Sequence, residues 1–82
     1  MTESENKHII MARMQLALAK HGVHTSLDMY VSNPSFTCLT YALDGEFKMV
    51  YPTDYTEEQL LDVWSKIESE GVDALSELGV SK

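Results

Sequence analysis

The side chains best suited to chemistry in this sequence are a close histidine pair and a single cysteine. His21 and His24 are three residues apart, and with Cys38 or Asp28 they could hold a metal ion. His24 could instead act as a base that activates the thiol of Cys38 as a nucleophile. The simpler interpretation is that His21 caps a helix, His24 lies in a loop, and Cys38 alternates onto the inner face of a strand, where a thiol behaves as a small hydrophobe.

Motifs that cradle phosphate, form a nucleophile elbow or bind zinc on a helix are absent from the sequence. A single cysteine also excludes an internal disulfide and a thiolate metal cluster made by one chain. We therefore expect no enzyme activity, no cofactor and no metal site.

The carboxylates are more informative, because they are unevenly distributed along the chain. The 82 residues include thirteen acidic and six basic side chains, which give a net charge of −7 and a pI of about 4.7. Residues 1–53 carry a net charge of only −1, whereas residues 54–82 carry −6. The acidic set of this second segment is Asp54, Glu57, Glu58, Asp62, Glu68, Glu70, Asp73 and Glu77.

This acidic set has two interpretations. It could simply keep a small domain soluble. It could also imitate the phosphate spacing of a nucleic acid and occupy a basic groove on a partner, since solubility alone does not require confinement to one third of the chain. Bulk charge disfavours direct binding to nucleic acid or to an anionic membrane. The leading hypothesis is a small acidic inhibitor or regulator that binds a nucleic-acid-binding surface of a partner protein.

The elements that must position these side chains begin with a helix over residues 2–20. Thr2 and Glu5 can form a capping box, and Gly22 follows the predicted end. Apolar residues recur at helical spacing, and further apolar residues widen the arc beyond one face: Ile9, Ala12, Leu16 and Ala19.

Three strands are predicted over residues 26–32, 36–43 and 46–51, with Asp44-Gly45 as a two-residue hairpin turn. This turn places Leu43 opposite Glu46, Tyr41 opposite Lys48 and Leu39 opposite Val50. These pairs share one face of the sheet, which carries the charged residues Glu46 and Lys48. We therefore predict that the opposite face is the inner one, packed against the helices. The inner set is then Phe36, Cys38, Ala42, Phe47 and Met49, and the outer apolar set is Tyr30, Leu39, Tyr41, Leu43 and Val50.

The outer apolar set supports an alternative function. An exposed, self-complementary patch of this kind would join two copies of the chain. In this alternative the protein is a homodimeric accessory domain with no catalytic role, and the acidity only keeps it soluble.

A second helix is predicted to begin at the N-cap Thr56, with Gln59 three residues on, and to end at Gly71. A short helix over Val72–Leu78 follows. The order α-β-β-β-α-α indicates one α+β domain over residues 1–82. We expect a two-layer sandwich in which helices cover one face of a three-stranded antiparallel sheet.

A cytoplasmic protein is expected. Glu3 and Glu5 occupy positions where a secretory signal needs positive charge. The longest uncharged run, residues 29–43, is too short and too polar to span a bilayer. The unpaired cysteine is consistent with a reducing compartment.

The predicted α-β-β-β-α order, with Asn33-Pro34-Ser35-Phe36-Thr37 between the first two strands, resembles the double-stranded-RNA-binding domain over roughly residues 7–70. That family grips phosphate with lysines at the start of its last helix. The matching stretch here is Thr56-Glu57-Glu58-Gln59, so the resemblance implies the fold without RNA contacts. In size, acidity and element order the chain is also similar to some phage-encoded anti-CRISPR and anti-restriction inhibitors, an analogy of shape and charge.

Overall fold

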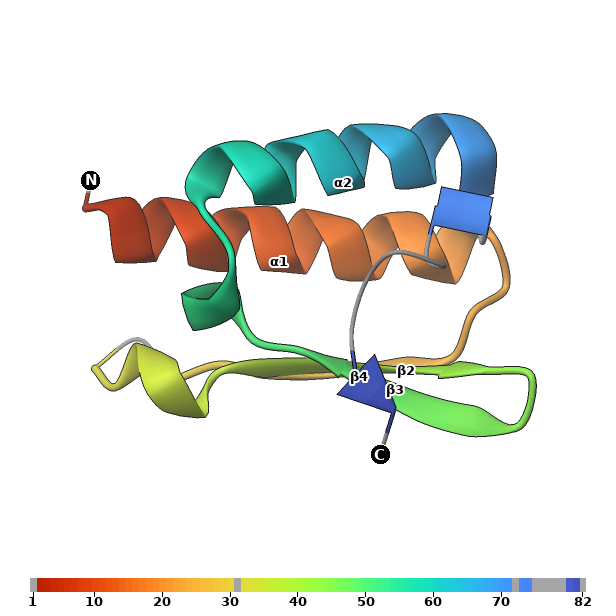
Figure 1. Cartoon of the computed structure of the whole chain (residues 1–82), viewed down its shortest axis with the longest axis horizontal. Coiled ribbons are helices and arrows are strands. Elements are labelled where there is room, and N and C mark those ends of the chain that lie inside the picture. Colours follow the sequence, from red (N-terminus) through yellow and green to blue (C-terminus); the bar gives the residue numbers. More distant parts are fainter. Residues whose placement is uncertain (1, 31, 72, 75–79, 82) are drawn as a thin grey trace.

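Two helices lie side by side on one face of an antiparallel sheet in the computed structural model (Figure 1), which describes residues 2–30, 32–71, 73–74 and 80–81. This arrangement confirms the predicted α+β class and the α-β-β-β-α order. The elements are α1 (Glu3–Lys20), β1 (Thr25–Asp28), β2 (Cys38–Leu43), β3 (Glu46–Val50), α2 (Glu57–Glu70) and β4 (Val80–Ser81).

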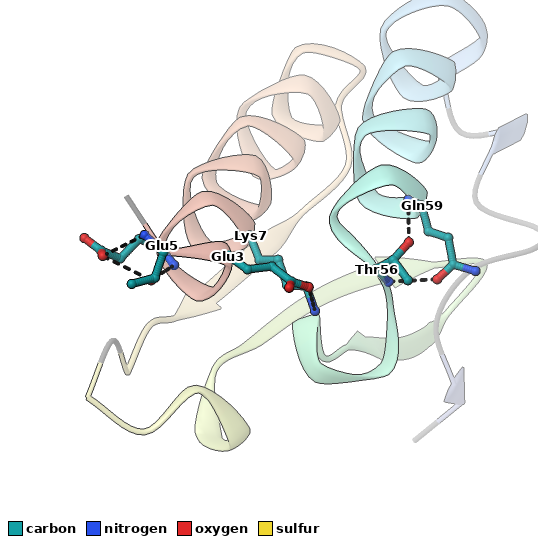
Figure 2. Close-up of polar contacts among 6 residues, drawn as sticks. Glu3, Glu5, Lys7, Thr56 and Gln59 are labelled. Atoms are coloured by element: carbon teal, nitrogen blue, oxygen red, sulfur yellow. Dashed lines mark hydrogen bonds and ion pairs between the residues drawn. The ribbon is translucent and has the colours of Figure 1, made fainter.

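Both predicted helix starts are confirmed as capping boxes. The Thr2 hydroxyl accepts a hydrogen bond from the Glu5 backbone N–H, and the Glu5 carboxylate accepts one from the Thr2 backbone N–H. Thr56 and Gln59 repeat this exchange at α2 (Figure 2). The helices begin at the same end of the molecule (Figure 1), so their positive dipole ends lie together, where carboxylates in the first turns are favourable.

The predicted hairpin register is confirmed. Leu39 pairs with Val50, Tyr41 with Lys48, and Leu43 with Glu46. Asp44 and Gly45 both have positive φ, of 53° and 80°, as a tight two-residue turn of this type requires. The strand order is β1-β2-β3-β4. The two-residue β4, which pairs with β3, was not predicted from the sequence.

The choice of inner face was wrong, since the core is formed by the face that the sequence analysis placed outside. Leu39, Tyr41 and Val50 are fully buried, and Leu43 packs against them. The residues of α1 and α2 that complete this core are Ile10, Met11, Met14, Ala17, Leu18, Leu60 and Ile67. The outer apolar set is therefore mostly core and supplies no dimer surface.

Two charged residues on this face misled the prediction. Glu46 lies at the hairpin end of β3 and is exposed there, and Lys48 is half-buried. A lysine in such a place buries its aliphatic stem while its ammonium group reaches solvent. Neither residue therefore prevents the face from packing on the helices.

The predicted inner set lies mostly on the open side of the sheet. Phe47 is 53% exposed and Phe36 is 62% exposed, while Ala42 and Met49 are half-buried. Cys38 alone of this set is buried. Tyr30 is half exposed and packs its ring edge-to-face on Phe36, with centroids 6.0 Å apart.

Gly71 closes α2 with a φ of 67°. A Cβ added there would lie 3.0 Å from Nδ1 of His21, so the imidazole of His21 packs on this glycine. The predicted last helix, Val72–Leu78, lies outside the described residues apart from positions 73 and 74.

Candidate protein-binding surface

The acidic set surrounds the outward half of α2. Leu60 and Ile67 are buried on the inner side of this helix, which leaves its carboxylates toward solvent. Glu57 is half-buried, and the other described members are exposed: Asp54, Glu58, Asp62, Glu68, Glu70 and Asp73. Glu77 lies outside the described residues.

Glu58 and Asp62 form the centre of this surface. They are four residues apart and therefore lie one above the other on the same side of α2. Leu61, to one side of this pair, is 41% exposed. With Thr56 and Gln59 these residues line a shallow hollow of about 500 Å³, which we call the acidic hollow.

The remaining carboxylates do not continue the same row. Glu57 and Glu68 lie about a quarter of a turn around the helix, on the side of Trp64. The Glu68 carboxylate accepts a hydrogen bond from the Trp64 indole N–H at 3.2 Å. Glu70 lies at a similar angle from the Glu58–Asp62 row, on the other side of the helix. These carboxylates are neighbours along the chain, but the helix distributes them over three directions.

Two cations lie close to this surface. Lys66 Nζ is 3.2 Å from Asp62 Oδ2, one turn away, and both side chains are largely exposed. The guanidinium of Arg13 in α1 lies over the Trp64 ring, 5.2 Å from its centroid. Lys66 is the only basic residue of α2, so the helix carries five carboxylates against one cation.

The acidic hollow has the chemistry to receive a basic side chain. A guanidinium or ammonium group would meet the carboxylates of Glu58 and Asp62, and its aliphatic stem would lie on Leu61. Thr56 and Gln59 add polar groups at the rim, although their side chains already take part in the capping box.

The candidate catalytic residues are not brought together. In the β1–β2 register Cys38 pairs with Asp28, whereas His24 precedes Thr25, which pairs with Tyr41 at the other end. Four residues of strand, about 13 Å, therefore separate His24 from the level of Cys38. Among the described residues no three histidine, cysteine or acidic side chains converge as a metal site.

A buried polar link that was not predicted from the sequence joins α1 to the segment that follows β1. His8 Nε2 and Thr37 Oγ1 lie 2.7 Å apart, and both residues are buried. The Thr37 hydroxyl also accepts a hydrogen bond from the Tyr30 backbone N–H at 2.8 Å. Neither residue belongs to a recognisable motif, so only the three-dimensional packing reveals the pair.

A second surface was also missed, although its residues were visible in the sequence. The apolar arc of α1 is wider than its packing needs, and its outer part remains exposed. Ile9, Ala12 and Leu16 form this part, which we call the α1 stripe. The stripe lines a shallow groove of about 550 Å³, whose wall also includes Met29.

No protein-family model matches the chain, and comparisons with curated proteins and with solved structures find no significant similarity. Within the described ranges, neither helix combines the length and the apolar content needed to cross a membrane.

Proposed function

We propose that this protein acts by binding another protein through the acidic hollow and the neighbouring carboxylates of α2, and that it inhibits or regulates a partner with a basic, nucleic-acid-binding surface. The observation that carries the proposal is that Glu58 and Asp62, both exposed, line one hollow together with the exposed Leu61. Side chains that only kept the protein soluble would not need to share a hollow with an exposed leucine.

The proposed role is one of binding rather than catalysis, in the cytoplasm. It is supported by the separation of His24 from Cys38 and by the burial of the Cys38 thiol, which limits its reactivity. A buried, unpaired thiol is also consistent with a reducing compartment.

Affinity capture with matched variants tests the proposal. The double variant Glu58→Gln/Asp62→Asn removes two charges from the acidic hollow. Asp28→Asn/Glu46→Gln removes two exposed charges from the sheet layer and leaves the same net charge. Each protein is immobilised and exposed to a lysate of the source organism, and the bound proteins are eluted with salt.

The proposal predicts that a basic protein binds to the wild type and to the sheet variant, elutes at high salt and is absent from the hollow variant. Equal loss of binding in both variants would mean that only the total charge matters. Undiminished binding to the hollow variant would refute the proposal.

A further inference from the structure

The outer side of α1 carries an apolar surface that no described part of the chain covers. Leu16 is 59% exposed and Ile9 is 39% exposed, and Ala12 lies exposed between them. Exposed apolar side chains that lie together on one side of a helix typically mark a contact surface. The α1 stripe therefore indicates a contact that the isolated chain does not make.

The residues along this stripe match those of a second copy when the two helices run antiparallel. Glu5, Ile9, Ala12, Leu16 and Lys20 recur every three or four residues and so share one side of the helix. If two copies of α1 pack antiparallel about a two-fold axis between positions 12 and 13, Ile9 is level with the second copy's Leu16. In the same arrangement Glu5 is level with the second copy's Lys20.

We propose that the α1 stripe is the interface of a homodimer, formed by antiparallel packing of two α1 helices. The two-fold axis forms each apolar contact and each acidic-to-basic contact twice, which is the self-complementarity that a closed dimer needs. Ala12 lies at the centre, where a small side chain permits the helix axes to approach to about 8–10 Å.

The charges around the stripe favour this partner. Helix α1 carries three basic and two acidic residues. Lys7 pairs with Glu3 at 3.4 Å, which leaves Glu5 as the acidic group of the first turn and Lys20 as the basic group of the last turn. Antiparallel packing brings the acidic end of one copy to the basic end of the other, and the helix dipoles also oppose favourably. The excess carboxylates of α2 would make two copies repel if they met through that helix instead.

Arg13 borders the groove that the stripe lines and could place a charge at the two-fold axis. Its guanidinium is instead turned toward α2, where it lies over the Trp64 ring at 5.2 Å. The groove of about 550 Å³ then offers space to an apolar side chain of the second copy. Because α2 lies on a different side of α1, the acidic hollow of each copy stays accessible in such a dimer.

The test is the mass in solution, measured by light scattering over a concentration series for the wild type and two matched variants. Leu16→Glu places a carboxylate in the stripe. Leu61→Glu places the same charge on an exposed leucine of α2, so it controls for the added charge. Circular dichroism and thermal unfolding verify that each variant is folded.

We expect a dimeric wild type, a dimeric Leu61→Glu variant and a monomeric Leu16→Glu variant that stays folded. A wild type that is monomeric at its highest soluble concentration overturns the proposal and leaves the stripe to a partner of different sequence. A dimer that survives Leu16→Glu, or one lost equally in both variants, overturns it as well.

A charge exchange tests the direction of the helices. Glu5→Lys and Lys20→Glu each replace two attractive contacts by repulsive ones, and each should weaken the dimer about five- to tenfold. The double variant Glu5→Lys/Lys20→Glu restores opposite charges. Because Glu5→Lys and the double variant both lose the capping box of α1, the affinity that the double variant recovers over Glu5→Lys comes from the charges. Additive losses in the double variant would exclude the antiparallel register.

Discussion

The outer sides of α1 and α2 differ in character, although the two helices share one core and begin with the same kind of capping box. Helix α1 exposes Ile9, Ala12 and Leu16, whereas α2 exposes Glu58 and Asp62 beside a single exposed leucine, Leu61. The shared inner sides explain why the domain folds. The contrasting outer sides indicate two separate contacts, one apolar and one acidic.

The comparison also shows why the net charge of the chain is a poor guide to its surfaces. Almost all of the charge lies in residues 54–82, so one helix accounts for most of it. The other helix lies on the same sheet face (Figure 1) and has a nearly neutral surface. A protein can therefore repel its own copies through one side and still associate through the other.

The largest expected effect is the difference in stability between substitutions on the inner and on the outer side of α1. Met14 is fully buried, while Leu16 is 59% exposed only two residues later. Met14→Ala should lower the free energy of unfolding by about 2–5 kcal/mol, because it leaves a cavity in the core. Leu16→Ala should change it by less than about 0.5 kcal/mol. Urea denaturation at low protein concentration, where subunits are dissociated, measures both; equal effects would contradict the orientation of α1.

Tyr41, in the sheet beneath both helices, should make the protein less stable at alkaline pH. Burial, with a smaller contribution from the nearby Tyr55, raises the pKa of Tyr41 from 10.0 to about 12. Between these pH values the unfolded chain loses the phenol proton and the folded chain keeps it. The free energy of unfolding is therefore maintained below about pH 10 and falls as the pH rises toward 12.

Urea denaturation as a function of pH measures this fall. Tyr41→Phe has no phenol to ionise, so its stability should depend less on pH in this window. Tyr30→Phe, at a half-exposed position, is the matched control. If the free energy of unfolding of Tyr41→Phe fell with pH between 10 and 12 as steeply as that of the wild type, the burial of Tyr41 would not be the cause of the fall.

Loss of the two capping boxes should affect the free energy of unfolding to different degrees, because the first turns of the two helices differ in how they contact the core. Leu60, in the first turn of α2, is fully buried, whereas among the α1 side chains whose burial is described the first buried one is His8, in the second turn. Thr56→Ala should lower the free energy of unfolding by about 1 kcal/mol. Thr2→Ala should have about half that effect or less, because the end of α1 can fray without disturbing the core. A larger effect at Thr2 in thermal unfolding would reverse this ranking.

The smallest expected effect concerns the cation on the acidic side of α2. Lys66→Gln removes the surface ion pair with Asp62, so the free energy of unfolding should change by less than about 0.5 kcal/mol. The same change frees Asp62 for an incoming basic group. Affinity for a basic partner, measured by calorimetry at low salt, should rise about twofold; a fall would mean that Lys66 itself contributes to binding.

Features fixed by neighbouring residues were predictable from the sequence. The pairs Thr2–Glu5 and Thr56–Gln59 predict both helix starts, and Asp44-Gly45 predicts the hairpin and its register. These signals are local, since each depends on residues at most a few positions apart.

The inner face of the sheet was not predictable by the same reasoning. Both faces of the β2–β3 hairpin contain apolar residues, so the outcome depends on which face fits the helices. The charge of Lys48 was a misleading criterion, because its stem is half-buried beside the core. The exposure of the acidic set followed from the amphipathic pattern of α2, but its division into three directions needed the helix geometry.

Competition for a nucleic-acid-binding protein tests the central claim most directly. A basic partner captured by the wild type is bound to a labelled duplex DNA or RNA that it recognises, and each protein is titrated into the complex. The proposed function predicts that the wild type and Asp28→Asn/Glu46→Gln release the nucleic acid at similar concentrations, and that Glu58→Gln/Asp62→Asn needs about tenfold more. Release that is equally efficient with the hollow variant, or no release by the wild type, would contradict the claim that the acidic hollow occupies a nucleic-acid-binding surface.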